Sequence, residues 1–169
     1  MSEPTVFTVG HSRHSADRFL AILRAHAIDQ VVDVRSQPCS KWAPHFDGSA
    51  LHRTLVASGV GYVFLGRQLG GRPEDRSVYW ADGTVDYALR ARAPDFADGV
   101  AQLLALARSR RTAILCAEED PACCHRRLLV TPALQRTGFT VAHIRGDARL
   151  EREPQPEAPR QIDLFGGSP

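Results

Sequence analysis

Apolar runs of four to six residues alternate with helical repeats along most of the chain, and this alternation constrains the fold more than any other feature. The runs that read as strands lie at residues 5–9, 31–34, 62–65, 112–116 and 139–144. Helical repeats occupy residues 15–27, 51–57, 96–107 and 124–136, and Pro132 is expected to kink or divide the last of them. Several strands are apolar at consecutive positions, which is typical of a parallel sheet covered on both faces. The sequence therefore predicts a three-layer α/β domain with a mostly parallel, Rossmann-like sheet and helices on both faces.

The domain is expected to end before a proline-rich segment. The chain has 169 residues, of which 43% are hydrophobic, and this is enough for one well-packed domain over residues 1–148. The sequence EREPQPEAPR, residues 151–160, holds three prolines and no large apolar side chain. Such a segment cannot bury enough surface to offset its ordering entropy, so we expect residues 149–160 to be an extended linker and the tail after them to be disordered.

The tail, residues 161–169, contains a short motif of its own. Its first five residues resemble the peptide by which bacterial repair and replication proteins bind the ring-shaped sliding clamp of DNA polymerase: Gln161, Ile162, Asp163, Leu164 and Phe165. A disordered arm with an aliphatic and aromatic anchor commonly orders on a partner. The alternative is that Phe165 packs back on the domain. The resemblance predicts the bacterial sliding clamp as a partner.

Charge, hydropathy and cysteine content limit the partners and the cellular compartment that we expect for the protein. From residue 146 onward there are three arginines and five acidic residues, which leaves 18 basic and 14 acidic residues in the body, a net charge of +4. This is compatible with DNA or a nucleotide as a partner, although Lys41 is the only lysine and a high-GC genome would produce the same arginine bias. The sequence has neither an apolar run long enough to span a membrane nor an export signal, so we expect a cytoplasmic protein without a membrane partner. Its four cysteines should then be reduced.

Polar side chains follow the predicted strands, and parallel strands bring their carboxyl ends to one edge of the sheet, where ligands bind. Five of these side chains are candidates for acid-base, nucleophilic or anion-binding work: His11, Asp33, Arg35, Cys116 and Glu118. Each taken alone could equally be a solvated or capping side chain. Their convergence predicts a site.

A long connection between residues 66 and 94 adds further candidates. It is rich in Gly, Arg and Asp, and its aromatic residues Tyr79, Trp80 and Tyr87 favour an ordered lid over the site. We also place His45 and Tyr62 in the pocket. Arg67 and Arg72, among glycines, could contact phosphate, although the pattern matches neither a P-loop nor a dinucleotide fingerprint, and ordinary turn glycines explain it as well.

Several motifs in order resemble the family of the domain of unknown function DUF488. They are T-V-G-H-S at residues 8–12, V-D-V-R at 32–35, P-H-F at 44–46, Y-x-x-L-G-x-x-L-G-G at 62–71, L-C-A-E at 115–118 and C-H-R at 124–126. The resemblance implies a three-layer α/β fold but no settled reaction. Cys39 stands where the family pattern usually has a basic or polar residue, so we do not treat it as a shared site.

The segment from Cys116 to Arg126 contains the densest group of side chains that could carry out chemistry. Asp120 and Pro121 read as the cap and first residue of a helix, which would place Cys123 and Cys124 in its first turn, where a thiolate or an anion is stabilised. One of the two cysteines could instead face inward as a small apolar residue, Cys123 more readily than Cys124. His125 and Arg126 are candidates for binding phosphate or nucleic acid.

We expect no cofactor and no metal. Cys116, Cys124, His125 and His143 could supply ligands only if the fold joined them, and their spacing is not that of a known zinc finger.

Three hypotheses on function follow. The first is a nucleic-acid-processing enzyme in DNA repair, recruited by the clamp, which hydrolyses a damaged nucleotide or transfers a group through a thiol. The second is a small-molecule enzyme with a thiol or acid-base site. The third is a noncatalytic adaptor that binds a nucleotide.

Overall fold

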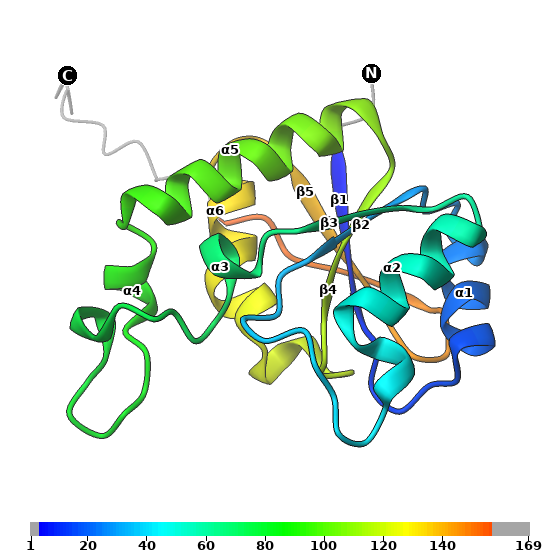
Figure 1. Ribbon diagram of the computed structural model, residues 1–169. Helices are drawn as coiled ribbons and strands as arrows, with labels where there is room; N and C mark the ends of the chain where they lie inside the picture. The colour runs from blue at the N-terminus through cyan, green and yellow to red at the C-terminus, as the bar shows by residue number, and fades with distance from the viewer. Residues whose placement is uncertain (1–3, 157–169) are drawn as a thin grey trace, which may run out of the picture.

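Five parallel strands and one antiparallel edge strand form a sheet in the computed structural model, which describes residues 4–156 (Figure 1). The order across the sheet is β3-β2-β4-β1-β5-β6, so β4 lies between the first two strands of the chain. The strands are β1 (Thr5–Gly10), β2 (Gln30–Asp33), β3 (Gly61–Phe64), β4 (Thr112–Cys116), β5 (Thr140–Ile144) and β6 (Leu150–Arg152). The predicted strands and the mostly parallel α/β fold are confirmed.

Helices cover both faces of the sheet, because successive strand residues point to opposite sides. In β2, Val31 packs beneath one helical layer and Val32 beneath the other, and both are fully buried. The first layer contains α1 (Ala16–Ala25) and α2 (Gly48–Ala57), and the second contains α3 (Gly66–Leu69), α5 (Pro94–Ser109) and α6 (Thr131–Gln135) (Figure 1). The predicted three-layer arrangement is therefore present.

The ends of the helices follow from local sequence. Ser15 accepts a hydrogen bond from the amide of Arg18 and so caps α1, and Pro94 opens α5, where its missing amide hydrogen costs nothing. Pro132 divides the last helical stretch as predicted. The chain forms a π-helical turn at Arg126–Val130 and then α6, with Pro132 in the first turn of α6.

The long connection between β3 and α5 contains regular elements, but of the three aromatic residues expected to form a lid only Tyr87 lines the candidate cavity described below. The connection contains α3, a 3-10 turn (Arg76–Val78), an isolated bridge between Tyr79 and Val85, and α4 (Tyr87–Arg90). Residues 70–86, drawn in green at the lower left of Figure 1, project away from the sheet. The buried guanidinium of Arg90 joins this segment to the body, since it donates to Asp95 and to the carbonyl oxygen of Gln68 at 2.6 Å.

The sheet extends into the segment that we predicted to be a linker. Residues 150–152 form β6, which pairs with β5, and the amide of Glu153 donates to the carbonyl oxygen of Val141. The side chain of Glu153 also contacts His143 at 2.7 Å and Arg127 at 2.8 Å. The rest of the linker beyond residue 156 and the motif Gln161–Phe165 lie outside the described residues. Between residues 4 and 156, no helix is long and apolar enough to cross a membrane.

Candidate functional site

The carboxyl ends of β2 and β4 open into a cavity of about 430 Å³, at the edge of the sheet where the sequence places a site. Its lining comes from three segments of the chain: Arg35, Ser36, Gln37 and Cys39 after β2, Gly71, Arg72 and Tyr87 from the long connection, and Cys116 at the end of β4 with Ala117, Glu118, Cys123, Cys124 and His125 after it. Close backbone packing shapes this edge. A Cβ at Gly10, the last residue of β1, would overlap the carbonyl oxygen of Glu118, so only glycine fits there.

Four side chains meet at the floor of the cavity. The Sγ atom of Cys116 lies 2.9 Å from Oε2 of Glu118 and 3.6 Å from Nδ1 of His125. The Sγ atom of Cys124 lies 3.4 Å from the same carboxylate oxygen and 3.8 Å from the same ring nitrogen. Both cysteines are buried, whereas Glu118 is exposed toward the cavity mouth. We call these four residues the Cys-His-Glu cluster.

The backbone fixes the second nitrogen of the His125 ring. Its Nε2 atom donates to the carbonyl oxygen of Val34 at 2.9 Å, which leaves Nδ1 with a free lone pair facing the two sulfur atoms. Gly71 packs against the same ring, where a Cβ would lie 2.7 Å from the Cβ of His125. The ring therefore has little freedom to turn away from the cysteines.

The two thiols of the cluster differ in acidity. The hydrogen bond from the Cys116 thiol, with help from His125 and the Arg126 guanidinium, lowers the pKa of Cys124 to about 5, although burial opposes this. The same hydrogen bond and burial raise the pKa of Cys116. For Glu118, burial opposes ionisation, but hydrogen bonds from the Cys116 thiol and from its own backbone amide lower its pKa below the ordinary range.

Arg126 lies under the cluster and is fully buried. Its guanidinium donates to the carbonyl oxygens of Glu118 and Glu119, and Nη1 lies 3.8 Å from Sγ of Cys124. A buried guanidinium holds the loop after β4 in place and brings a positive charge to the sulfur. Arg126 is thus inside the wall of the cavity rather than on the surface, where a phosphate could reach it.

A second network lies beside the cluster and shares Arg35 with the cavity. Asp33 is fully buried and accepts from Arg35 through Nε at 2.9 Å and Nη2 at 2.6 Å, and from the Tyr62 hydroxyl at 2.9 Å. The Nη1 atom of Arg35 donates to Nε2 of His11 at 3.2 Å, while Nδ1 of His11 donates to the carbonyl oxygen of Ser12. Burial lowers the pKa of His11 to about 4, so its ring is neutral at pH 7.

The remaining predicted residues separate into two groups. Arg72 and Tyr87 line the cavity. Arg67 lies in a neighbouring hollow, Tyr79 donates to the carbonyl oxygen of Pro73 outside the cavity, and Trp80 is 60% exposed on the projecting segment. His45 lies elsewhere with Nε2 bonded to the carbonyl oxygen of His14, and it lines a small hollow beside Arg13 and Trp42.

The local structure around the adjacent cysteines differs from the expected helix start. Asp120 caps only a 3-10 turn, Pro121–Cys123, and Cys124 has an extended backbone before the π-helical turn begins. Cys124 rather than Cys123 faces inward, because the extended residue reverses the direction of the side chain; Cys123 is exposed at the cavity. The positive charge beside Cys124 consequently comes from Arg126, and not from the amino end of a helix.

Sequence reasoning missed several lining residues, chiefly Ser36, Gln37 and Cys39. Cys39 was set aside because it departs from the family pattern, yet it is exposed and lines the cavity. A usable signal was present: residues 36–39 directly follow β2, so the rule that placed Arg35 at the edge covers them too.

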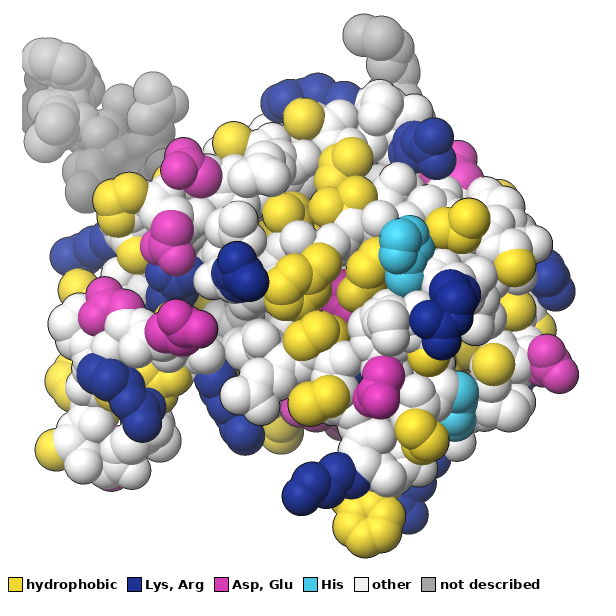
Figure 2. Space-filling model, in the orientation of Figure 1, with side chains coloured by type: hydrophobic (Ala, Val, Ile, Leu, Met, Phe, Trp, Pro, Cys, Tyr) yellow, Lys and Arg dark blue, Asp and Glu magenta, His cyan; other side chains and the backbone are white. Residues whose placement is uncertain are grey.

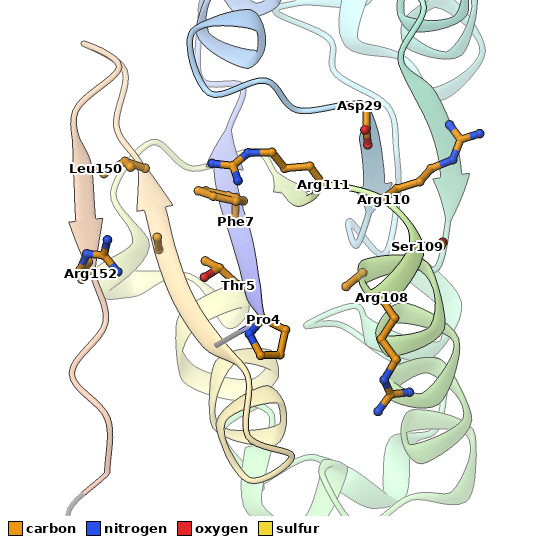
Figure 3. A pocket seen from close by; sticks show the side chains of 12 residues that line it. Pro4, Thr5, Phe7, Asp29, Arg108, Ser109, Arg110, Arg111, Leu150 and Arg152 are labelled. Atoms are coloured by element: carbon orange, nitrogen blue, oxygen red, sulfur yellow. The ribbon is translucent and has the colours of Figure 1, made fainter. Parts of the chain in front are cut away.

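Another hollow, of about 500 Å³, lies at the opposite edge of the sheet and is rich in arginine (Figure 3). Its guanidinium groups point in different directions, and that of Arg111 stacks over the Phe7 ring at 4.3 Å and donates to the carbonyl oxygen of His26. The arginines therefore do not converge on one anion, and the cavity at the carboxyl edge is the better candidate for chemistry.

Fold and cavity together define an α/β protein with a Cys-His-Glu cluster at the carboxyl edge of a parallel sheet. A family model described as Domain of unknown function DUF488 matches residues 15–132, which is more than half of the chain, so the chain belongs to this family. The matched range contains every residue that lines the cavity. Comparison with curated proteins and with solved structures found no match.

Proposed function

We propose that this protein is an enzyme that processes a nucleic acid or nucleotide in DNA repair, and that the bacterial sliding clamp recruits it. The observation that carries the proposal is the sequence Gln161–Phe165, which resembles the clamp-binding peptide of bacterial repair and replication proteins. A peptide that binds the clamp would hold the domain near DNA and raise its local concentration there.

The charge of the body is consistent with recruitment by such a tether. The body carries a net charge of only +4. On the face shown in Figure 2, Lys and Arg side chains are interspersed with Asp and Glu rather than gathered in one broad basic surface. Phosphate contacts supply most of the affinity of a protein for DNA, so a body of this kind gains from being delivered by a partner.

The cavity supports a chemical rather than a purely binding role. Two thiols, an imidazole and a carboxylate within hydrogen-bonding range can activate a nucleophile or move a proton. Its volume of about 430 Å³ suits a single base or nucleotide, either free or turned out of a strand. Arg72 is exposed at its rim and could contact a phosphate, and the half-buried Tyr87 ring could stack on a base.

The recruitment is tested by titrating the full-length chain against a bacterial sliding clamp. We expect micromolar binding that is lost in Gln161→Ala and in Phe165→Ala, with Leu150→Ala as a control outside the motif. Absence of binding by the unmodified chain would refute the clamp as a partner.

The enzymatic part is tested separately, with DNA duplexes and free nucleotides that carry damaged bases. We expect turnover by the full-length chain that is lost in Glu118→Gln, while binding of the same substrate persists. Binding without turnover in the unmodified chain would identify an adaptor. Turnover of free small molecules alone, without clamp binding, would favour a small-molecule enzyme.

A further inference from the structure

We propose that Cys116, Cys124 and His125 bind a zinc ion. The three ligand atoms, two sulfurs and Nδ1 of the imidazole, all lie within 4.8 Å of one another at the floor of the cavity. The metal site rests on this geometry alone and does not depend on the proposed function.

The distances fit a tetrahedral metal. Zinc binds thiolate at about 2.3 Å and imidazole at about 2.0–2.1 Å, so sulfur and nitrogen ligands on one tetrahedral ion lie about 3.5 Å apart. The corresponding distances are 3.6 Å for Cys116 and 3.8 Å for Cys124, each measured from Sγ to Nδ1 of His125. The two Sγ atoms lie within 4.8 Å of each other, against about 3.8 Å on a tetrahedral ion, so a shift of at most about 1 Å would admit the ion.

The surroundings orient the ligands as in a metal site. A histidine that binds a metal usually donates its other ring hydrogen to a carbonyl or carboxylate, and His125 does so through Nε2 to Val34. This contact leaves Nδ1 as the free donor atom toward the two sulfurs. The guanidinium of Arg126, 3.8 Å from Sγ of Cys124, offsets the negative charge that two thiolates bring to a buried place.

The choice of metal follows from the ligand types. Two thiolates and one imidazole form a soft set that favours zinc over magnesium or calcium, which prefer oxygen ligands. Sequence spacing could not indicate this set, because Cys116 ends β4 while Cys124 and His125 follow a separate turn. His143, which the sequence suggested as a further ligand, is bonded to Thr8 and Glu153 instead.

Three protein ligands leave the fourth position of a tetrahedral ion open, as in catalytic zinc sites. Glu118 lines the same cavity, with Oε2 2.9 Å from Sγ of Cys116 and 3.4 Å from Sγ of Cys124. If the proposed function holds, this arrangement favours hydrolysis over transfer through a thiol, since both buried thiols would be ligands. Zinc held there would supply a Lewis acid for a water molecule; the hydroxyl of that water would replace the leaving group on the substrate, and Glu118 would carry the proton of the water to the leaving group.

The test uses the full-length chain without DNA or clamp, so its outcome is independent of the proposed function. We expect one zinc ion per chain by elemental analysis after purification in zinc-containing medium. Replacement by Co²⁺ should give the thiolate-to-cobalt charge-transfer band and the visible bands of tetrahedral coordination. These measurements need no variant, so misfolding cannot obscure them.

Variants then assign the ligands. Competition with a chromogenic chelator should show affinity for zinc at least about 100-fold lower in Cys124→Ser and in His125→Ala. Cys123→Ser and Cys39→Ser change exposed cysteines of the same cavity and should retain the affinity of the unmodified chain. The proposal is overturned if the chain holds less than a tenth of an equivalent of zinc in zinc-supplemented buffer. It is equally overturned if the cobalt form lacks the charge-transfer band, or if Cys124→Ser binds as the unmodified chain does.

Discussion

Substituting Asp33 by Asn should destabilise the fold strongly, because one buried carboxylate holds the end of β2 together. Its Oδ1 accepts from the amide and Nε of Arg35, and its Oδ2 accepts from Nη2 of Arg35 and from the hydroxyl of Tyr62. An Asn side chain keeps the shape but loses the charge and offers only one accepting oxygen. The guanidinium, which is 5% exposed, would remain buried with no carboxylate beside it.

Removing one partner from a buried ion pair costs about 3–5 kcal/mol, and we expect Asp33→Asn to fall in this range. For a domain of this size, each kcal/mol lowers the melting temperature by about 2–4 °C, so the expected decrease is roughly 6–20 °C. Urea and thermal unfolding, each followed by circular dichroism, would measure both quantities.

The control is Tyr62→Phe, which removes one hydrogen bond to the same carboxylate and leaves the ion pair intact. A bond to a charged group contributes about 1.5–3 kcal/mol, and the half-buried position of Tyr62 places its effect at the lower end. The reasoning is refuted if Asp33→Asn costs less than about 1 kcal/mol, well below the range for a broken buried pair. A normally stable Asp33→Asn that lost only turnover would instead show that Asp33 supports the site rather than the fold.

Three further predictions concern other parts of the fold. Burial lowers the pKa of His143 below 6.5 in the folded protein, so the unfolded chain binds a proton at this residue more readily. The contribution of neutral His143 to the free energy of unfolding is therefore fully present above pH 6.5. It is lost as the pH falls through the folded-state pKa. The loss of stability on acidification, measured by urea unfolding at several pH values, should be smaller in His143→Gln, and an unchanged dependence would contradict this. Gly10→Ala should cost about 1–3 kcal/mol in unfolding experiments, because the new methyl group would overlap the Glu118 carbonyl and the backbone must shift; wild-type stability would show that the strand end can yield. Arg90→Met should cost about 2 kcal/mol or more, since the carbonyl oxygen of Gln68 and the carboxylate of Asp95 lose the buried guanidinium that donates to them. Protease digestion should then cleave the projecting segment faster than in the unmodified chain.

Hydrophobic pattern alone predicted the strands and the layers, because buried parallel strands have nearly continuous apolar sequences. The order of the strands could not be obtained in this way. The insertion of β4 between β2 and β1 depends on the path of the crossover through α5, and no local pattern encodes it. The strand-end rule nevertheless placed Cys116, Glu118 and Arg35 at one edge, since parallel strands share a direction whatever their order.

The features that sequence missed are set by tertiary contacts. Leu150–Arg152 is exposed throughout and has no apolar alternation, so it reads as part of a linker. It becomes a strand because the open edge of β5 offers backbone hydrogen bonds, and because Arg145 pairs with Glu151 at 2.7 Å. Local geometry also explains why Cys124, rather than Cys123 as expected, is the buried cysteine. One extended residue between two short turns decides which thiol faces inward, and periodicity does not resolve a single residue.

The two polar networks at this edge share one segment of backbone, which leads to a last prediction. The carbonyl oxygen of Val34, which fixes the ring of His125, lies between Asp33 and Arg35 in the chain. Because the ion pair of these neighbours holds that segment, it should act as a remote support of the Cys-His-Glu cluster.

If the cluster binds zinc as proposed, Asp33→Asn should therefore weaken zinc binding although Asp33 contacts no ligand. Loss of an outer support of a metal ligand typically costs 10-fold to 100-fold in affinity, and we expect about 10-fold here because Val34 also keeps its hydrogen bond to Leu115. The affinity should be measured by chelator competition well below the lowered melting temperature, so that only folded protein is compared. Tyr62→Phe, which leaves the ion pair in place, should bind zinc as the unmodified chain does. Equal affinities in all three proteins would show that the carbonyl oxygen of Val34 is held without the ion pair, and that the two networks are only neighbours.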